Sequence, residues 1–322
     1  MDAMVQSSAA PNPWPGCDGF AHHLLEGLRK TPKEIACKFF YDSEGSALFE
    51  AICALPEYYQ TRTEVALLRR HAGEIASLIG PGAQIVEFGA GALRKIRILL
   101  DALASPAAYV PIDISGAYLR DVVRLLAADY PALSLSPVIA DFTLPLTLPP
   151  FLPSGSGRRV GFFPGSTIGN FRPPAALALL RRMREHLGGG GLLIGVDLVK
   201  DPALLHAAYN DSAGVTAAFN KNLLARANRE LGAGFDLDAF AHYAPYDLHN
   251  RRIEMYLVSA KRQSIQLAGE TIHFAAGEAV HTEDSQKYSI ECFREMAVRA
   301  GFSPRAVWTD ENRLFSLHWL ES

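Results

Sequence analysis

The sequence predicts an α/β protein whose main domain is a doubly wound parallel sheet, accompanied by a discontinuous second domain of the α+β class. Three observations support this prediction. Short apolar strands alternate with helical segments between residues 83 and 199, which is typical of parallel βαβ units. Acidic residues close the first three of these strands. After Lys200 the sequence alternates with a period of two, which is typical of antiparallel strands.

Helices are expected before the sheet. Apolar residues recur at helical spacing in residues 22–29 and 45–54. Pro56 then interrupts the pattern, and an amphipathic helix is expected over residues 63–78. The segment from Met1 to about Gly19 is rich in Ala, Pro, Ser and Gly, and we expect it to fray.

The main sheet is expected to contain five parallel strands with helices between them. The strands are expected at residues 84–88, 109–112, 134–140, 159–163 and 192–199, and the helices at residues 95–104, 116–128 and 174–187. In such sheets ligands bind beyond the carboxyl ends of the strands, so residues at those ends are the first candidates for a site.

The second domain is expected to be discontinuous in sequence. Residues 201–228 read as one helix, and residues 252–258 and 264–274 read as a β-hairpin around Gly269-Glu270, outside the parallel sheet. A helix over 287–300 and a strand pair at 306–309 and 314–320 then complete the main sheet. The expected main domain is residues 61–199 with 287–322, and the expected second domain is residues 1–60 with 200–286.

Composition favours a cytoplasmic globular protein with a small-molecule ligand. The 322 residues are 49% hydrophobic and 20% charged, and the net charge of −3 provides no general attraction for nucleic acid or an anionic membrane. No apolar run approaches the ~20 residues that span a bilayer, and the N-terminus lacks the pattern of a signal peptide. The four cysteines form no CxxC pair and the histidines show no zinc-ligand spacing, so free thiols and no metal are expected. The sequence does not determine the oligomeric state, and a monomer is compatible with it.

The ends of the first three expected strands carry acids. Glu87 lies at the end of the first strand, just before Gly89 and Gly91, and glycines at such a turn let backbone amides approach a ligand. Asp113 follows the second strand, where a carboxylate can accept hydrogen bonds from both hydroxyls of a ribose. Asp141 follows the third strand, where it can accept from an adenine amino group. Each alone is compatible with a solvated surface acid, but the series of three favours a site.

The acids favour S-adenosylmethionine over a dinucleotide. A dinucleotide fingerprint requires a third glycine where this chain has Arg94. An acidic pocket repels a pyrophosphate but suits a sulfonium and an ammonium. The expected antiparallel strand pair at the C-terminus also matches the sheet of a Rossmann-like class I S-adenosylmethionine-dependent methyltransferase.

Several longer motifs resemble one family. They are Lys38-Phe39-Phe40-Tyr41-Asp42-Ser43, Leu55-Pro56-Glu57-Tyr58-Tyr59, Thr61-Arg62-Thr63-Glu64, Gly165-Ser166-Thr167-Ile168-Gly169-Asn170, Asp197-Leu198-Val199-Lys200-Asp201, Tyr209-Asn210-Asp211, Arg252-Ile253-Glu254-Met255, and Thr282-Glu283 with Ser285 and Lys287. Together they resemble the histidine Nα-methyltransferases of ergothioneine biosynthesis, which form hercynine, the trimethylbetaine of histidine. The resemblance extends from about Pro32 to the C-terminus.

The resemblance implies two sets of site residues. For S-adenosylmethionine they are Gly89, Lys95, Asp113, Asp141 and Phe142. For histidine they are Tyr58, Asn170, Tyr209, Glu283 and Ser285, with Tyr41, Phe49 and Met255 nearby. The implied chemistry uses no strong general base: Tyr41 and Asn170 orient the amine for transfer, and S-adenosylhomocysteine is the second product.

The turn after the first strand departs from the family. Ala92-Leu93-Arg94 stands where the family carries Thr-Ser-Glu, which removes a hydroxyl and a carboxylate near the methionine end of the cofactor. Two alternatives therefore stay open. One is an Nα-methyltransferase of another amino acid, such as tryptophan or tyrosine. The other is a catalytically silent homologue that binds S-adenosylmethionine or serves as a scaffold.

Overall fold

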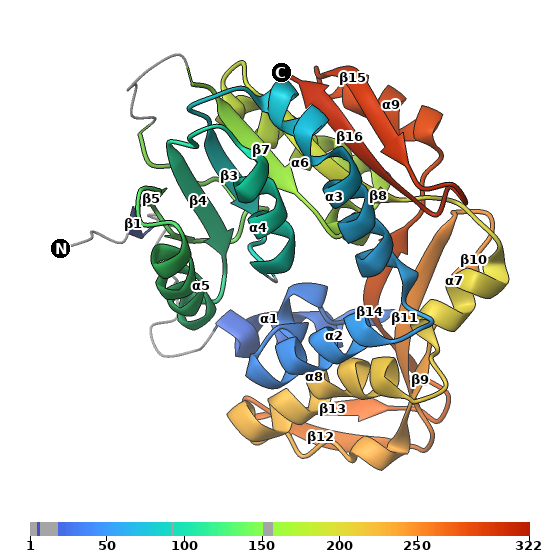
Figure 1. The fold of residues 1–322 in the computed structure, drawn as a ribbon. Coiled ribbons are helices and arrows are strands. Elements are labelled where there is room, and N and C mark those ends of the chain that lie inside the picture. Colours follow the sequence, from blue (N-terminus) through green and yellow to red (C-terminus); the bar gives the residue numbers. More distant parts are fainter. Residues whose placement is uncertain (1–4, 7–18, 92, 151–156) are drawn as a thin grey trace. The chain divides into compact units, whose positions relative to one another are not determined.

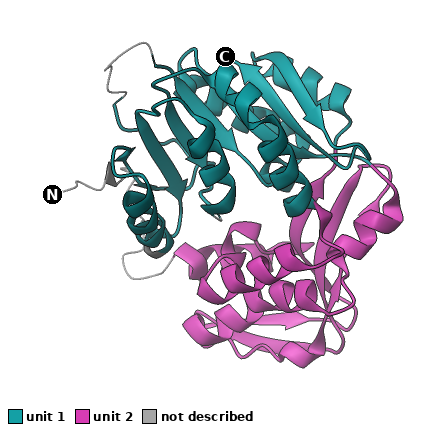
Figure 2. Cartoon of the chain, viewed as in Figure 1, with its two compact units in different colours: residues 1–11, 60–199, 288–322 teal, residues 12–59, 200–287 magenta. Residues whose placement is uncertain are grey.

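The computed structural model describes residues 5–6, 19–91, 93–150 and 157–322 (Figure 1). The expected fraying of the first residues therefore falls largely outside the described part of the chain, as do Cys17 and Ala92. The chain forms two compact units (Figure 2). Unit 1 comprises the described residues within 1–11, 60–199 and 288–322, and unit 2 those within 12–59 and 200–287. Among the helices so described, none is long and apolar enough to cross a membrane.

Unit 1 is built on one large sheet. Its strands are β1 (Val5–Gln6), β3 (Gln84–Phe88), β4 (Ala108–Asp113), β5 (Ser134–Leu135), β6 (Val138–Ile139), β7 (Arg159–Phe163), β8 (Gly191–Asp197), β15 (Ser303–Thr309) and β16 (Phe315–Glu321). Their order is β1-β6-β4-β3-β7-β8-β16-β15, with β5 also paired to β4. The strands from β6 to β8 are parallel, whereas β16 is antiparallel to both of its neighbours. This topology confirms the prediction of a Rossmann-like class I methyltransferase sheet.

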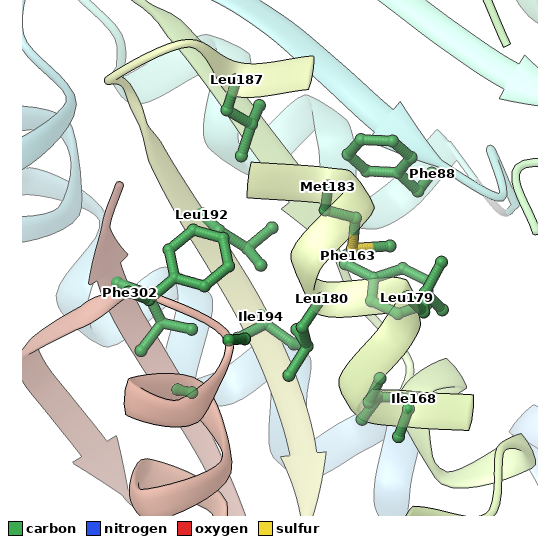
Figure 3. Packing of buried hydrophobic residues seen from close by; sticks show 14 of the residues in the cluster. Phe88, Phe163, Ile168, Leu179, Leu180, Met183, Leu187, Leu192, Ile194 and Phe302 are labelled. Atoms are coloured by element: carbon green, nitrogen blue, oxygen red, sulfur yellow. The ribbon is translucent and has the colours of Figure 1, made fainter. Parts of the chain in front are cut away.

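Helices cover both faces of this sheet. They are α3 (Tyr59–Ile79), α4 (Leu93–Ala102), α5 (Gly116–Asp129), α6 (Pro173–Leu187) and α9 (Ile290–Arg299). Successive strand residues point to opposite faces, so Ile85 packs in the cluster with α3, α4 and α5, and Val86 packs in the cluster with α6 and α9. Figure 3 shows the second cluster, in which Leu179, Leu180 and Met183 of α6 lie against the sheet. The doubly wound core holds the strand ends of unit 1 in fixed positions.

Unit 2 combines helices with a mixed sheet. The helices are α1 (Gly19–Arg29), α2 (Ser43–Ala54), α7 (Pro202–Tyr209) and α8 (Val215–Leu231). The strands are β2 (Lys33–Glu34), β9 (Phe240–Tyr243), β10 (Tyr246–Asp247), β11 (Arg252–Ser259), β12 (Gln263–Leu267), β13 (Glu270–Phe274) and β14 (Ala279–Gln286). Five of them form a sheet in the order β10-β11-β14-β2, with β9 also paired to β11. Strands β12 and β13 form a separate hairpin around Gly269, as predicted for residues 264–274. The prediction that residues 252–258 belong to the same hairpin is wrong, because they form β11 and pair with β9, β10 and β14.

Short helical segments of type 3₁₀ occur in both units: η1 (Cys37–Phe40), η2 (Thr167–Asn170) and η3 (Leu237–Ala239).

Two other predicted elements are also wrong in detail. The expected helix over 201–228 is two helices, α7 and α8, because residues 210–214 turn away from helical geometry. Gly214 has a φ of +72°, and the Asp211 carboxylate accepts hydrogen bonds from the amides of Val215 and Thr216, which start α8. The expected strand over 134–140 is divided into β5 and β6 at Pro137, which has no amide hydrogen for the sheet.

Candidate functional site

The end of β3 in unit 1 brings a glycine against an aromatic ring. Gly89 has a φ of +76°, and its amide donates to the carbonyl of Ile112 over 2.9 Å. A Cβ at position 89 would lie 3.2 Å from the ring of Phe142, closer than an ordinary contact. Glycine therefore gives this turn both the left-handed backbone and the room that Phe142 occupies.

Two carboxylates lie at the ends of neighbouring strands. Asp113 ends β4, and Asp141 lies two residues after the end of β6. The amide of Ala140 donates to the carbonyl of Asp113 over 3.0 Å, which ties the two strand ends together. One carboxylate oxygen of each acid is held by a nearby amide: that of Ser115 for Asp113 at 2.7 Å, and that of Thr143 for Asp141 at 2.9 Å. Burial raises the pKa of Asp113 to about 6.

Glu87 differs from these two acids. It lies inside β3 rather than after it, and its side chain is buried. Its carboxylate accepts a hydrogen bond from the hydroxyl of Tyr109 on the adjacent strand. Burial raises the pKa of Glu87 to about 8. The expectation that three acids form one series is therefore corrected: two lie at strand ends, and Glu87 is bonded within the sheet.

The remaining candidate residues of unit 1 lie on α4 and on the loop after β7. Lys95 is in the first turn of α4, and its ammonium lies 2.5 Å from a carboxylate oxygen of Glu64 on α3. Asn170 ends the short helix η2 and is half-buried. Of the turn that departs from the family pattern, Ala92 lies outside the described residues, and Arg94 is exposed on α4.

These groups fit S-adenosylmethionine. Carboxylates at two adjacent strand ends accept hydrogen bonds from hydroxyl or amino groups, and the Phe142 ring offers a face for stacking. The half-buried acids suit a cationic ligand better than a pyrophosphate. Among the residues that the structure describes, no group of three or more His, Cys, Asp or Glu side chains is placed to hold a metal ion.

Unit 2 gathers a cluster of aromatic side chains, which we call the aromatic cluster. It contains Tyr41, Phe49, Tyr58, Tyr209 and Phe219. Neighbouring rings meet edge to face, with centroids 5.6 Å apart for Tyr41 and Phe49, 6.3 Å for Phe49 and Tyr58, and 6.4 Å for Tyr58 and Tyr209. Burial raises the pKa of both Tyr41 and Tyr58 well above the ordinary value. Their phenols therefore stay protonated at physiological pH.

Strand β14 places Glu283 next to this cluster through a β-bulge. Met255 of β11 pairs with Glu283, and Tyr256 pairs with His281, so that Thr282 is an extra residue. Paired residues share a face, and Met255 and Tyr256 point to opposite faces. Glu283 therefore lies on the face of Met255, whereas His281 packs on Tyr256 at 5.4 Å.

Glu283 carries a perturbed carboxyl group. Burial raises the pKa of Glu283 to about 7, although the charge of Lys287 acts in the opposite direction. The charge of Glu283 also raises the pKa of Tyr41 and Tyr58. The Glu283 carboxyl group therefore interacts electrostatically with two phenols of the aromatic cluster.

Ser285 and Tyr209 share a buried hydrogen-bond network with a lysine. Their hydroxyl oxygens are 2.7 Å apart. The ammonium of Lys287 donates to Ser285 over 2.7 Å and to Tyr209 over 3.0 Å, and it lies 4.8 Å from the centre of the Tyr209 ring. Lys287 is only 1% exposed. A buried ammonium of this kind fixes the positions of both hydroxyls.

The candidate residues fall into two sets, one in each unit. Unit 1 holds Gly89, Lys95, Asp113, Asp141, Phe142 and Asn170, and unit 2 holds Tyr41, Phe49, Tyr58, Tyr209, Met255, Glu283 and Ser285. Sequence reasoning gave no role to Phe219 or Lys287. For Lys287 a signal existed, since it belongs to the motif of Thr282-Glu283, Ser285 and Lys287 that resembles the family.

Comparison with known proteins agrees with this arrangement. The family model of the S-adenosylmethionine-dependent, histidine-specific methyltransferases matches residues 20–322. The histidine N-alpha-methyltransferase of Mycolicibacterium smegmatis is 41% identical over 297 residues, covering 90% of this chain and 91% of the relative. That of Mycobacterium tuberculosis is 42% identical over 300 residues, covering 91% and 92%. Ergothioneine biosynthesis protein 1 of Neurospora crassa is 32% identical over 303 residues, which cover 90% of this chain and 33% of that protein. The chain belongs to the family of histidine-specific methyltransferases that use S-adenosylmethionine.

Proposed function

We propose that this chain methylates the α-amino group of L-histidine three times to give hercynine, and that the reaction serves ergothioneine biosynthesis. The observation that carries the proposal is the position of Glu283 and Ser285, a carboxylate and a hydroxyl beside the aromatic cluster. These two groups match the two nitrogens of an imidazole. Apolar side chains would leave both groups unpaired. The two mycobacterial relatives, which bear the name of this activity, support it.

The groups of unit 1 are assigned to the cofactor. S-adenosylmethionine supplies a methyl group activated by its sulfonium. Asp113 accepts from the ribose hydroxyls, Asp141 accepts from the adenine amino group, and Phe142 stacks on the adenine. Gly89 lets the backbone approach the ligand, and Lys95 binds the methionine carboxylate.

The groups that bind the amino acid are assigned as follows. Asn170 and Tyr209 donate to the carboxylate of histidine. Glu283 accepts one imidazole N–H, Ser285 serves the other ring nitrogen, and Tyr58 packs on the ring.

The transfer step requires orientation rather than a strong base. The amine must be neutral to react, and a free α-amino group has a pKa near ~8, so it loses its proton to water on binding. Tyr41 and Asn170 then orient the lone pair, because the raised pKa of Tyr41 leaves its phenol neutral. Tyr41 and Phe49 surround the growing ammonium by cation–π contact, and Met255 packs beside Glu283.

Mass spectrometry tests the proposal directly. The purified chain is incubated with S-adenosylmethionine and an equimolar mixture of the twenty amino acids, and fragmentation locates the added methyl groups. The expected product is histidine with three methyl groups on the α-nitrogen. A methylated tryptophan or tyrosine instead would overturn the roles of Glu283 and Ser285. Binding of the cofactor without any product would identify a silent homologue.

A further inference from the structure

We propose that Glu64 is a positioning residue that fixes both Lys95 and the loop of residues 164–170 for ligand binding. The inference rests on the proposed function, because that assigns Lys95 to the cofactor and Asn170 to the substrate. Glu64 lies on α3, outside the residues assigned so far. All groups in the argument belong to unit 1.

The Glu64 carboxylate is fully buried and is held from two sides. Its exposed fraction is 0%, and the ammonium of Lys95 lies 2.5 Å from its Oε2. The amide of Gly165 donates to both carboxylate oxygens, each over 2.9 Å. Burying a carboxylate without such partners would cost a large desolvation free energy. The contacts with Lys95 and Gly165 offset this cost.

The neighbouring strand leaves room for this carboxylate. A Cβ added at Gly195 of β8 would overlap Oε1 of Glu64. Any residue other than glycine at position 195 would therefore displace the carboxylate from Lys95 and Gly165. The cavity that holds Glu64 is thus built by the sheet as well as by α3.

The loop that Glu64 contacts has an unusual backbone. Gly165 and Ser166 have φ values of +79° and +55°. The loop is closed by hydrogen bonds from Thr167 to the carbonyl of Pro164 and from the amide of Gly169 to the carbonyl of Ser166. Glu64 binds the first amide of this loop, and Asn170 lies at its other end. The loop backbone therefore connects the residue that binds Glu64 with Asn170.

Lysine needs such a partner to act as a defined ligand group. Its side chain is long and flexible, and its ammonium is a point charge without directional preference. The ion pair with Glu64 restricts Lys95 to one position before any ligand binds, which lowers the entropic cost of binding. Glu64 itself touches no reacting atom in this account.

A double-mutant cycle tests the inference with a binding readout. Affinity for S-adenosylhomocysteine is measured by calorimetry for the wild type, Glu64→Gln, Lys95→Met and the double variant, and thermal unfolding is recorded for each. In Glu64→Gln the new amide side chain would still accept from Gly165 but would turn an uncharged group toward Lys95. The matched control is Glu74→Gln, an exposed glutamate of the same helix that accepts from Trp308.

The two outcomes are distinct. We expect Glu64→Gln to weaken binding of S-adenosylhomocysteine about 10-fold, and the double variant to bind no more weakly than Lys95→Met. The inference would be overturned if Glu64→Gln bound S-adenosylhomocysteine with normal affinity. It would also be overturned if the loss of affinity in the double variant equalled the product of the losses in the two single variants. If Lys95→Met does not fold, Lys95→Gln, whose side-chain amide can still donate a hydrogen bond to Glu64, takes its place in the cycle, and losses that multiply in its double variant again overturn the inference. Because no amino acid is present, the result is independent of which amino acid is methylated.

Discussion

The two units build their candidate ligand groups in different ways. In unit 1 the groups lie where strands end, and backbone amides hold them, as for Asp113 and Asp141. In unit 2 the groups come from segments far apart in sequence, and their side chains hold one another, as for Tyr209, Ser285 and Lys287. A site that is held by backbone amides keeps its ligand when nearby side chains are replaced. A site that is held by side-chain contacts changes its ligand specificity when one of those side chains is replaced. The proposed division of labour, cofactor in unit 1 and imidazole in unit 2, follows this difference.

The largest expected effect is a loss of cofactor affinity when a cofactor-binding group of unit 1 is removed. Asp113→Ala removes a carboxylate that accepts from two ribose hydroxyls, and hydrogen bonds to a charged group contribute about 1.5–3 kcal/mol each. We expect affinity for S-adenosylhomocysteine to fall at least about 100-fold by calorimetry. The control is Asp129→Asn, an exposed acid on α5. Unchanged affinity in Asp113→Ala would show that the strand-end acid does not bind the cofactor.

The second prediction concerns the effect of Glu283, the group proposed to select histidine, on the stability of the fold. The pKa of Glu283 is about 7 in the folded chain, above the ordinary 4.5, so the folded state binds this proton more tightly than the unfolded state. Glu283 therefore destabilises the fold increasingly as pH rises from 4.5 to 7, by at most about 3 kcal/mol above that range. We expect Glu283→Gln to raise the Tm at pH 8 but not at pH 4.5. An equal change in Tm at both pH values would contradict this account, and Glu270→Gln on β13, where the glutamate side chain is 43% exposed, is the control.

The third prediction tests whether Glu283 selects the substrate. Glu283→Ala removes the acceptor of the imidazole N–H and leaves the aromatic cluster in place. We expect histidine affinity to fall about 30-fold, about 2 kcal/mol, and the preference for histidine over tryptophan to narrow. Isothermal titration with both amino acids in the presence of S-adenosylhomocysteine measures this. Asp284→Asn, on the opposite face of β14, should leave the preference unchanged.

The fourth prediction addresses the one amino-acid-binding residue assigned to unit 1. Asn170→Ala is expected to weaken histidine about 10-fold, about 1.4 kcal/mol, because a donor to the carboxylate is lost. Affinity for S-adenosylhomocysteine should stay the same. A loss of cofactor affinity with normal histidine binding would move Asn170 to the cofactor groups.

The smallest expected effect concerns the course of methylation. Phe49→Leu keeps an apolar side chain but removes a π-face, and a cation–π contact contributes about 0.5–1 kcal/mol. We expect the third transfer to slow about 2- to 5-fold relative to the first, so that dimethylhistidine accumulates. The ratio of the methylated forms within one time course provides the internal control. An unchanged ratio of the methylated forms would show that Phe49 does not contact the ammonium.

Sequence alone predicted unit 1 better than unit 2, for physical reasons. Apolar strands followed by Gly89, Asp113 and Asp141 reveal their positions locally, because the strand ends are marked in the sequence. Glu87 was grouped with these residues because it lies only one residue before the end of β3. A shift of one position along the chain decides whether a side chain points toward a ligand beyond the strand end or contacts a neighbouring strand.

Strand β14 was not predicted, although it carries Glu283 and Ser285. Its eight residues, 279–286, include few apolar side chains, so the alternation that predicts a strand is absent. The reason is functional in our proposal: the face toward the aromatic cluster is lined by polar groups. Sites of this kind break the local rules that make strands recognisable. The family resemblance supplied these residues, whereas periodicity did not.

The bulge at Thr282 has a consequence for self-recognition. In an unbroken strand, His281 and Glu283 would share a face, because residues two apart always do. The chain would then place an imidazole of its own beside the carboxylate that is proposed to hold the imidazole of its substrate. The extra residue turns His281 to the other face, where its Nε2 lies 3.1 Å from Asp284. An irregularity of one residue thereby keeps an enzyme for histidine from being occupied by its own histidine.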